Sequence, residues 1–203
     1  MNVTAFYQQL PLLRTPRLLL RELHKKDDGD YFAFASDPQV TRYLRWGPHT
    51  SLDETQAYLS GVLAGYRSGT DGPWGIELAQ ERRLIGAIHL MGIDPNHLKA
   101  DVGVVLHSQY WGQGLGSEAL QAVLTLCFTD LGLQRVQGLA ITGNASVCRM
   151  MVKCGMKHEG ILRHYALQKG QWCDFEQYAI LRNEFRPIHS TVTIEPVLGC
   201  DNL

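Results

Sequence analysis

Three alternating glycines, Gly112, Gly114 and Gly116, stand between a strand-like run and the strongest helix pattern of the chain. Glycine lets the backbone approach a ligand closely and adopt a positive φ angle. The free N–H groups at the start of the following helix supply a partial positive charge. The segment therefore predicts a site that holds a phosphate or pyrophosphate, although a tight connection between strand and helix would have the same composition.

Other phosphate-binding loops do not fit these residues. A P-loop ends in Gly-Lys-Ser/Thr, and no lysine follows the glycines, so hydrolysis of nucleotide triphosphates is not predicted. In a dinucleotide-binding loop the third glycine of GxGxxG would fall on Ser117, and the strand ending near Ile141 and Thr142 carries no acid for a ribose. What remains is a pyrophosphate held by backbone groups.

Hydrophobic periodicity predicts one α/β domain over residues 1–186, followed by a C-terminal tail over 187–203. The expected order is strand, two helices, three strands, helix, strand, helix and two strands, which describes a mixed sheet with helices packed on it. Expected strands cover residues 18–23, 74–79, 84–91, 101–106 and 135–141, with a last hairpin around 169–171. Expected helices cover residues 27–35, closed by Pro38, then 51–66 behind a capping box, 117–131 before Gly132, and 147–154 before Gly155.

The composition of the 203 residues is that of a soluble globular protein, with 45% hydrophobic residues and 19 basic side chains against 20 acidic ones. Neither nucleic acid nor a membrane is an expected partner, and the cytoplasm is the expected location. The five cysteines form no CxxC pair and the eight histidines form no HExxH motif. We therefore expect free thiols and no metal site.

Two blocks of sequence resemble the GNAT superfamily of N-acetyltransferases. The segment from Gly112 to Gly116 is similar to the loop that holds the pyrophosphate of acetyl-coenzyme A in that superfamily, with Ser117 opening the next helix. The segment from Asn144 to Met156, followed by Glu159-Gly160, resembles a segment of the Rim-type branch, which acetylates the N-termini of ribosomal proteins.

The opening of the chain resembles the same branch. Arg14-Thr15-Pro16-Arg17-Leu18 is similar to its first strand, and Leu44-Arg45-Trp46 to its acceptor-side linker. The resemblance covers roughly Leu13 to Arg186. It implies a mostly antiparallel central sheet flanked by helices, acetyl-coenzyme A as co-substrate, and a primary amine as acceptor, with a protein N-terminus favoured. A homodimer is common among similar proteins and is a further expectation.

The resemblance also implies roles for individual residues. Asp101 would act as general base through water, although a solvent-facing charge at a strand end is an equal interpretation. Asn144 would contact the pantetheine arm while it caps a helix. Trp46 and Tyr165 would line the acceptor cleft. The residues expected to hold the coenzyme are Val104, Val105, Leu106, Trp111, Gly112, Gln113, Gly114, Leu115, Gly116, Ser117, Asn144 and Arg149.

The chain departs from the superfamily where a proton donor is usual. Met151 stands where many relatives have a tyrosine, and Val147 where Rim-type enzymes have a serine. Ser146 is the nearest hydroxyl, and helical geometry predicts that it points elsewhere. We expect direct attack of a neutral amine on the thioester, with backbone N–H groups stabilising the oxyanion. A small-molecule amine acetyltransferase and a non-catalytic coenzyme A-binding or sensing protein remain alternatives.

Overall fold

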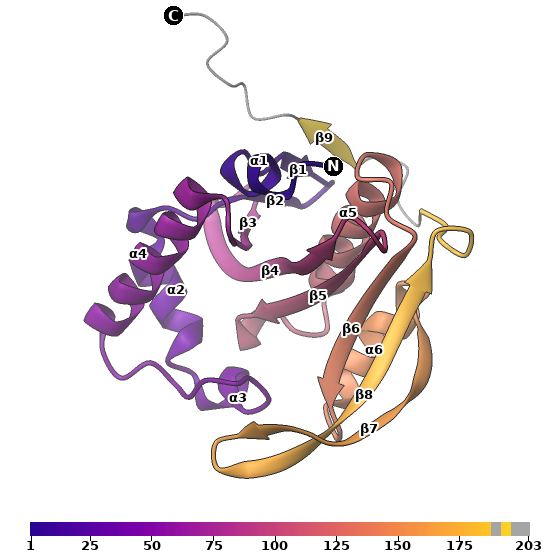
Figure 1. Ribbon diagram of the computed structural model, residues 1–203. Helices are drawn as coiled ribbons and strands as arrows, with labels where there is room; N and C mark the ends of the chain where they lie inside the picture. The colour runs from indigo at the N-terminus through magenta and orange to yellow at the C-terminus, as the bar shows by residue number, and fades with distance from the viewer. Residues whose placement is uncertain (188–191, 196–203) are drawn as a thin grey trace, which may run out of the picture.

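The computed structural model describes residues 1–187 and 192–195. This part of the chain forms one nine-stranded sheet with helices on both faces (Figure 1), in the strand order β7-β8-β6-β5-β4-β3-β2-β1-β9. Neighbouring strands are antiparallel, except β5 and β6. The strands are β1 (Leu12–Arg14), β2 (Leu18–Glu22), β3 (Trp74–Leu78), β4 (Arg83–Asp94), β5 (Lys99–Leu106), β6 (Arg135–Ile141), β7 (Lys157–Gln168), β8 (Gln171–Leu181) and β9 (Thr193–Glu195).

The helices cover the sheet in two groups. On one face α5 packs against β1, β2, β4 and β5, and α6 packs against β6, β7 and β8. On the other face α2 packs on β4 and contacts α4, which also contacts α1. None of the helices in the described residues is both long and apolar enough to cross a membrane. The helices are α1 (Val3–Gln8), α2 (Asp28–Ala35), α3 (Pro38–Thr41), α4 (Leu52–Ser68), α5 (Leu115–Thr129) and α6 (Ala145–Lys153).

The mixed, mostly antiparallel sheet flanked by helices confirms the expected fold class. Helix α4 begins after Ser51, whose Oγ accepts a hydrogen bond from the backbone N–H of Glu54 at 3.3 Å, as the capping pattern predicts. Pro38 does not close α2 directly. It is the first residue of α3, where its missing N–H has no cost, and Asp37 caps that helix.

The ends of the chain add elements that the hydrophobic pattern did not predict. Helix α1 and strand β1 precede the first expected strand, and β9 lies within the expected tail and pairs with β1. The pairing joins Leu12 to Glu195 and Arg14 to Thr193. Three-residue strands are too short to show a period of two, so no alternation could reveal them. The rest of the tail, including Cys200, lies outside the described residues.

Strands β5 and β6 diverge, and this divergence positions the site. Their parallel pairing covers only Lys99 to Asp101 against Arg135 to Gln137. Beyond Asp101 strand β5 continues to pair with β4, while its other edge has no strand partner in the described part of the chain. Backbone groups of Val104 to Leu106 on that edge are therefore available to a ligand.

Candidate active site

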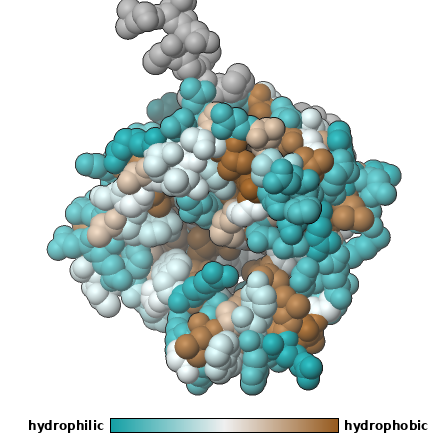
Figure 2. Space-filling model, viewed as in Figure 1, coloured by the Kyte–Doolittle hydropathy of each residue, from teal (hydrophilic) through white to brown (hydrophobic). Residues whose placement is uncertain are grey.

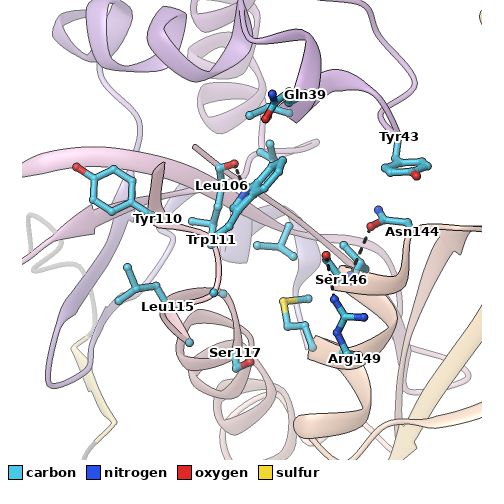
Figure 3. A pocket seen from close by; sticks show the side chains of 18 of the residues that line it. Gln39, Tyr43, Leu106, Tyr110, Trp111, Leu115, Ser117, Asn144, Ser146 and Arg149 are labelled. Atoms are coloured by element: carbon cyan, nitrogen blue, oxygen red, sulfur yellow. Dashed lines mark hydrogen bonds between the residues drawn. The ribbon is translucent and has the colours of Figure 1, made fainter. Parts of the chain in front are cut away.

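A cavity of about 600 Å³ lies where β5 leaves β6. Its walls are the arm around α3 (residues 37–44), the end of β5, the glycine loop with the start of α5, and the start of α6 (Figure 3). Figure 2 shows that the face viewed in Figure 1 is hollowed near its centre, with hydrophobic surface inside the hollow. The lining residues are Gln39, Val40, Arg42, Tyr43, Leu44, Val104, Val105, Leu106, Tyr110, Trp111, Gly112, Gly114, Leu115, Gly116, Ser117, Asn144, Ser146, Val147, Arg149, Met150 and Lys153.

The glycine loop has the backbone conformation that its sequence requires. Gly112 and Gly114 have φ angles of 75° and 79°, a region that side-chain-bearing residues rarely adopt. Gly114 is the N-cap of α5, so the helix begins at Leu115, two residues before the predicted start. The first N–H groups of α5 have no partner within the helix. These N–H groups are therefore available, together with those of the glycine loop, to bind an anion.

The side chains of Trp111 and Gln113 both bond to backbone carbonyls that precede the glycine loop. The indole Nε1 of Trp111 donates to the carbonyl of Leu106 at 2.9 Å, which ties the loop to the end of β5. Gln113 does not line the cavity, because its side-chain Nε2 donates to the carbonyl of Gln109 at 2.9 Å. The remaining residues expected to hold the coenzyme all line the cavity.

The cavity is cationic. Its lining includes Arg42, Arg149 and Lys153 and no aspartate or glutamate. A Cβ placed on Gly114 would lie 3.6 Å from Nη2 of Arg17 and 3.8 Å from Nζ of Lys153, so two cations border the same point of the loop. Positive charge around a helix start supports binding of a phosphate-bearing ligand.

The start of α6 forms the opposite wall. Asn144 caps this helix, with its side chain 3.5 Å from the N–H of Val147. The expectation that Ser146 points elsewhere is wrong, because both Ser146 and Val147 line the cavity. Ser146, Arg149, Met150 and Lys153 follow one another at helical spacing, so one side of α6 borders the cavity along its length, and Val147 in the first turn also reaches it (Figure 3). Nη2 of Arg149 lies 3.4 Å from Oγ of Ser146.

Met151, which replaces the usual tyrosine, does not reach the cavity. It is 3% exposed, and its Sδ lies 3.0 Å from where a Cβ on Gly138 would be. The residue is therefore part of the core between α6 and β6. In the described part of the chain, Cys127, Cys148, Cys154 and Cys173 are free thiols, and no group of three or more metal-ligating side chains comes together.

Three of the expected catalytic and acceptor residues lie outside the cavity lining. Asp101 stands where β5 and β6 part, paired with Met91 and Gln137, three residues or about 10 Å along the strand from Val104. Trp46 is half-buried against His49, at 5.2 Å between ring centroids. Tyr165 is 49% exposed and lines a separate groove in the β7–β8 hairpin.

The sequence reasoning missed the contribution of the α3 arm. Gln39, Arg42 and Tyr43 line the cavity, and the Tyr43 hydroxyl donates to the carbonyl of Gly143 at 3.2 Å, across to the β6–α6 loop. Nζ of Lys169, at the tip of the β7–β8 hairpin, donates to the carbonyl of Thr41 at 2.7 Å. The sequence signal nearest to this role is the resemblance of Leu44-Arg45-Trp46 to an acceptor-side linker, and Leu44 lines the cavity.

Fold and site together suit an elongated, phosphate-bearing ligand along an open strand edge. The chain belongs to the GNAT acetyltransferase family: the family described as "Acetyltransferase (GNAT) domain" matches residues 17–157. YoaA, an uncharacterized N-acetyltransferase of Bacillus subtilis (strain 168), is 31% identical over 172 residues, which cover 85% of this chain and 97% of YoaA. Membership of this family makes the chain an acetyl-coenzyme A-dependent N-acetyltransferase.

Other similar proteins include two whose names give different acceptors, ribosomal protein and spermidine, and one whose name gives none. "Putative ribosomal N-acetyltransferase YdaF" of Bacillus subtilis (strain 168) is 26% identical over 77% of this chain and 79% of its own length. A GNAT acetyltransferase from Bacillus anthracis superposes with a TM-score of 0.77 at 26% identity, over 85% of this chain and 99% of its own. Spermidine N-acetyltransferase from Vibrio cholerae, solved with CoA and spermine, superposes with a TM-score of 0.71 at 22% identity, over 84% of this chain and 98% of its own.

Proposed function

We propose that this N-acetyltransferase moves the acetyl group of acetyl-coenzyme A to the α-amine of a protein N-terminus. The observation that carries the proposal is one cavity that joins a cationic glycine loop to the open edge of β5 and to the start of α6. The loop suits the pyrophosphate, and the backbone of Val104 to Leu106 suits the pantetheine arm and the thioester.

Transfer is direct in this proposal. The lone pair of a neutral amine attacks the thioester carbonyl carbon, and a backbone N–H of β5 stabilises the oxyanion. The C–S bond then breaks, and the sulfur leaves with the bonding electrons. Asp101 lies about 10 Å along β5 from Val104, so a chain of waters carries the proton of the new ammonium to it, and water protonates the thiolate. Asn144 holds the pantetheine arm beside the end of β5.

The charge of the cavity favours one kind of amine. A polyamine carries several ammonium groups near neutral pH, and its desolvation is offset only by facing carboxylates. The lining has three cationic residues and no carboxylate. A protein α-amine has a pKa of about 7.7–8.0, against about 10.4 for lysine, so a substantial share is already neutral without an adjacent base. The named activity of the V. cholerae relative on spermidine therefore does not carry over in this proposal.

A small primary amine without further positive charges is the second candidate acceptor. The cavity lining offers polar side chains from Gln39, Tyr43 and Ser146 to a small acceptor. Trp46 and Tyr165 would then play no part, which agrees with their places outside the cavity lining. A protein N-terminus remains favoured, and in that case the α3 arm and the β7–β8 hairpin border its path.

A non-catalytic coenzyme A-binding protein is the third candidate, because Val147 and Met151 replace the serine and tyrosine hydroxyls that are usual in relatives. Release of coenzyme A thiol in the presence of amines separates the three. The proposal expects release with a peptide that has a free N-terminus, and none with the same peptide N-acetylated but carrying a lysine. Release with spermidine or a small amine alone would overturn the acceptor assignment. Binding of coenzyme A without release under any condition would establish the non-catalytic candidate.

A further inference from the structure

A buried carboxylate joins two distant parts of the sequence beneath the glycine loop. Glu118, in the first turn of α5, is 3% exposed. Its Oε1 accepts hydrogen bonds from Oγ1 of Thr15 at 2.6 Å and from the backbone N–H of Arg17 at 3.0 Å. Its Oε2 accepts from Nε of Arg17 at 2.7 Å, and Nη2 of the same guanidinium lies 2.6 Å away. We refer to this arrangement as the Arg17–Glu118 clasp.

The clasp leaves part of the guanidinium beside the loop. Nη1 of Arg17 donates to the backbone carbonyl of Gln113 at 3.0 Å, which fixes the peptide before Gly114. Nη2 lies 3.6 Å from the position of a Cβ on Gly114, and Nζ of Lys153 lies 3.8 Å from the same position. Two cations, one from the β1–β2 connection and one from the end of α6, therefore converge on one point beside the loop. Lys153 forms no ion pair within residues 1–187 and 192–195.

The charges of Glu118, Arg17 and Lys153 together set the net charge beside the glycine loop. A buried carboxylate at the start of α5 would by itself weaken the attraction of that helix end for a phosphate. Burial alone would raise the pKa of Glu118, but hydrogen bonds from Thr15 and Arg17 hold it below its ordinary value, so the group stays ionised. Arg17 neutralises this charge, and Lys153 adds a net positive charge at the loop.

The exposure of Arg17 distinguishes the clasp from a fully buried structural ion pair. The side chain of Arg17 is 48% exposed, in contrast to its partner at 3%. The contacts of Nε and Nη2 with Oε2 of Glu118, together with the Nη1 bond to Gln113, fix the direction of the guanidinium, which limits the conformational entropy that binding must remove. The geometry thus combines a buried anchor with an accessible donor next to Gly114.

We propose that Arg17 is a coenzyme-binding residue that Glu118 positions, and that Arg17 and Lys153 bind the pyrophosphate of acetyl-coenzyme A above Gly114. This inference rests on the proposed coenzyme site at the glycine loop. It gives a function to the Arg14–Leu18 block, which resembles relatives in sequence but lies outside the loop. Glu118 acts here only through Arg17 and is a positioning residue.

The first test measures binding of coenzyme A and of dephospho-coenzyme A, which keeps the pyrophosphate but lacks the 3′-phosphate. Losing one charge-assisted contact typically costs 1.5–3 kcal/mol, so Arg17→Ala should weaken both ligands about 10- to 100-fold in calorimetry. Arg14→Ala is the matched control. The substitution removes the same charge nearby, and Arg14 makes an exposed ion pair with Glu195. It should change either affinity less than about twofold.

The outcomes separate the possible failures. Weakening of coenzyme A alone would assign Arg17 to the 3′-phosphate and overturn the inference. A lower melting temperature with unchanged affinities would make the clasp purely structural and also overturn it. If the wild-type protein binds neither ligand, the coenzyme site of the proposed function fails instead. Arg17→Lys keeps the charge without the planar fork and should retain intermediate affinity, which covers the case in which Arg17→Ala does not fold.

The positioning role of Glu118 has its own test. Glu118→Gln keeps the shape, removes a negative charge near the loop and releases the guanidinium. We expect the loss of positioning to outweigh the gain in positive charge, so that both ligands bind about 3- to 10-fold more weakly, a smaller effect than that of Arg17→Ala. In the double variant the effects should not add, because Glu118 acts through Arg17. Additive losses of affinity would show that Glu118 affects binding independently and would overturn this part of the inference.

Discussion

Replacing Gly114 by aspartate would put a carboxylate where the structure brings two cations together. A Cβ at this position meets Arg17 and Lys153 at 3.6 and 3.8 Å, which are ordinary van der Waals distances, so the fold has room for the side chain. The φ angle of 79° is the main cost to stability. A side chain in this region costs about 1–2 kcal/mol, and aspartate tolerates it better than most residues. We expect a melting temperature lower by about 2–8 °C.

The effect on coenzyme binding should be far larger. The new carboxylate would occupy the place of a phosphate and pair with the same cations. Two like charges about 4 Å apart repel by about 4 kcal/mol at an effective dielectric constant of 20, nearly a thousandfold in affinity. Solvent screening at these partly exposed groups reduces this value. We therefore expect Gly114→Asp to weaken coenzyme A binding at least ~100-fold in calorimetry.

Gly112→Asp is the matched control for this experiment. Gly112 has a similar φ angle of 75°, and no atom lies within 4 Å of its added Cβ. The variant has the same added charge and a similar backbone strain but lacks the two cations. Its melting temperature should fall by a similar amount, whereas its affinity should fall by about tenfold or less. Equal losses in the two variants, or wild-type affinity in a folded Gly114→Asp protein, would refute the assignment of the pyrophosphate to this point.

Further expectations concern catalysis and stability. Asp101→Asn should lower kcat about 100-fold without changing coenzyme A affinity, as steady-state kinetics and calorimetry can show; wild-type turnover and pH profile would exclude Asp101 as the base. Ser146→Ala should leave kcat within about threefold, because a thiol with a pKa near that of free cysteine leaves without an acid, and a ~100-fold loss would identify a general acid. Glu118→Gln should lower the melting temperature at pH 7. The pKa of Glu118 is lowered by folding, so its stabilisation is present above the unfolded value of about 4.3 and is lost as the pH falls below it. The difference between variant and wild type should therefore shrink on acidification, and a constant difference from pH 7 to pH 3 would contradict the ionised, clasped state.

The local sequence was sufficient for most of the fold. Strand β6 spans the predicted residues 135–141, and the turn around Gly170 joins β7 to β8 as expected. These elements follow from periodicity and turn chemistry, which act between near neighbours in the chain. Helical periodicity also predicts α5, but with a start at Ser117. The helix in fact includes Leu115 and Gly116, because the low helix propensity of a glycine-rich stretch is overcome by its surroundings.

The site was predicted only in part, because several contacts depend on long-range packing. The alternating glycines and Asn144 carry local signatures, and they do meet at one cavity. Arg17 and Glu118 lie 101 residues apart, and nothing in either segment shows that they touch. The α3 arm is held at the cavity by contacts distant in sequence, among them Tyr43 with Gly143, Lys169 with Thr41 and Ser108 with Asp37. Ser146 reaches the cavity because the side of α6 that borders it includes Ser146, Arg149, Met150 and Lys153, whereas Val147 lies at the margin of that side.

The most direct test of the account is a mass-spectrometric assay of the acceptor atom. The protein is incubated with acetyl-coenzyme A and an equimolar mixture of a peptide with a free N-terminus and an internal lysine, spermidine, and a small monoamine. We predict that the peptide gains one acetyl group on its α-amine and that fragmentation finds none on the lysine. Acetylation of spermidine or of the lysine in preference to the α-amine would contradict the proposed acceptor, and no acetylated product from a protein that binds coenzyme A would contradict catalysis itself.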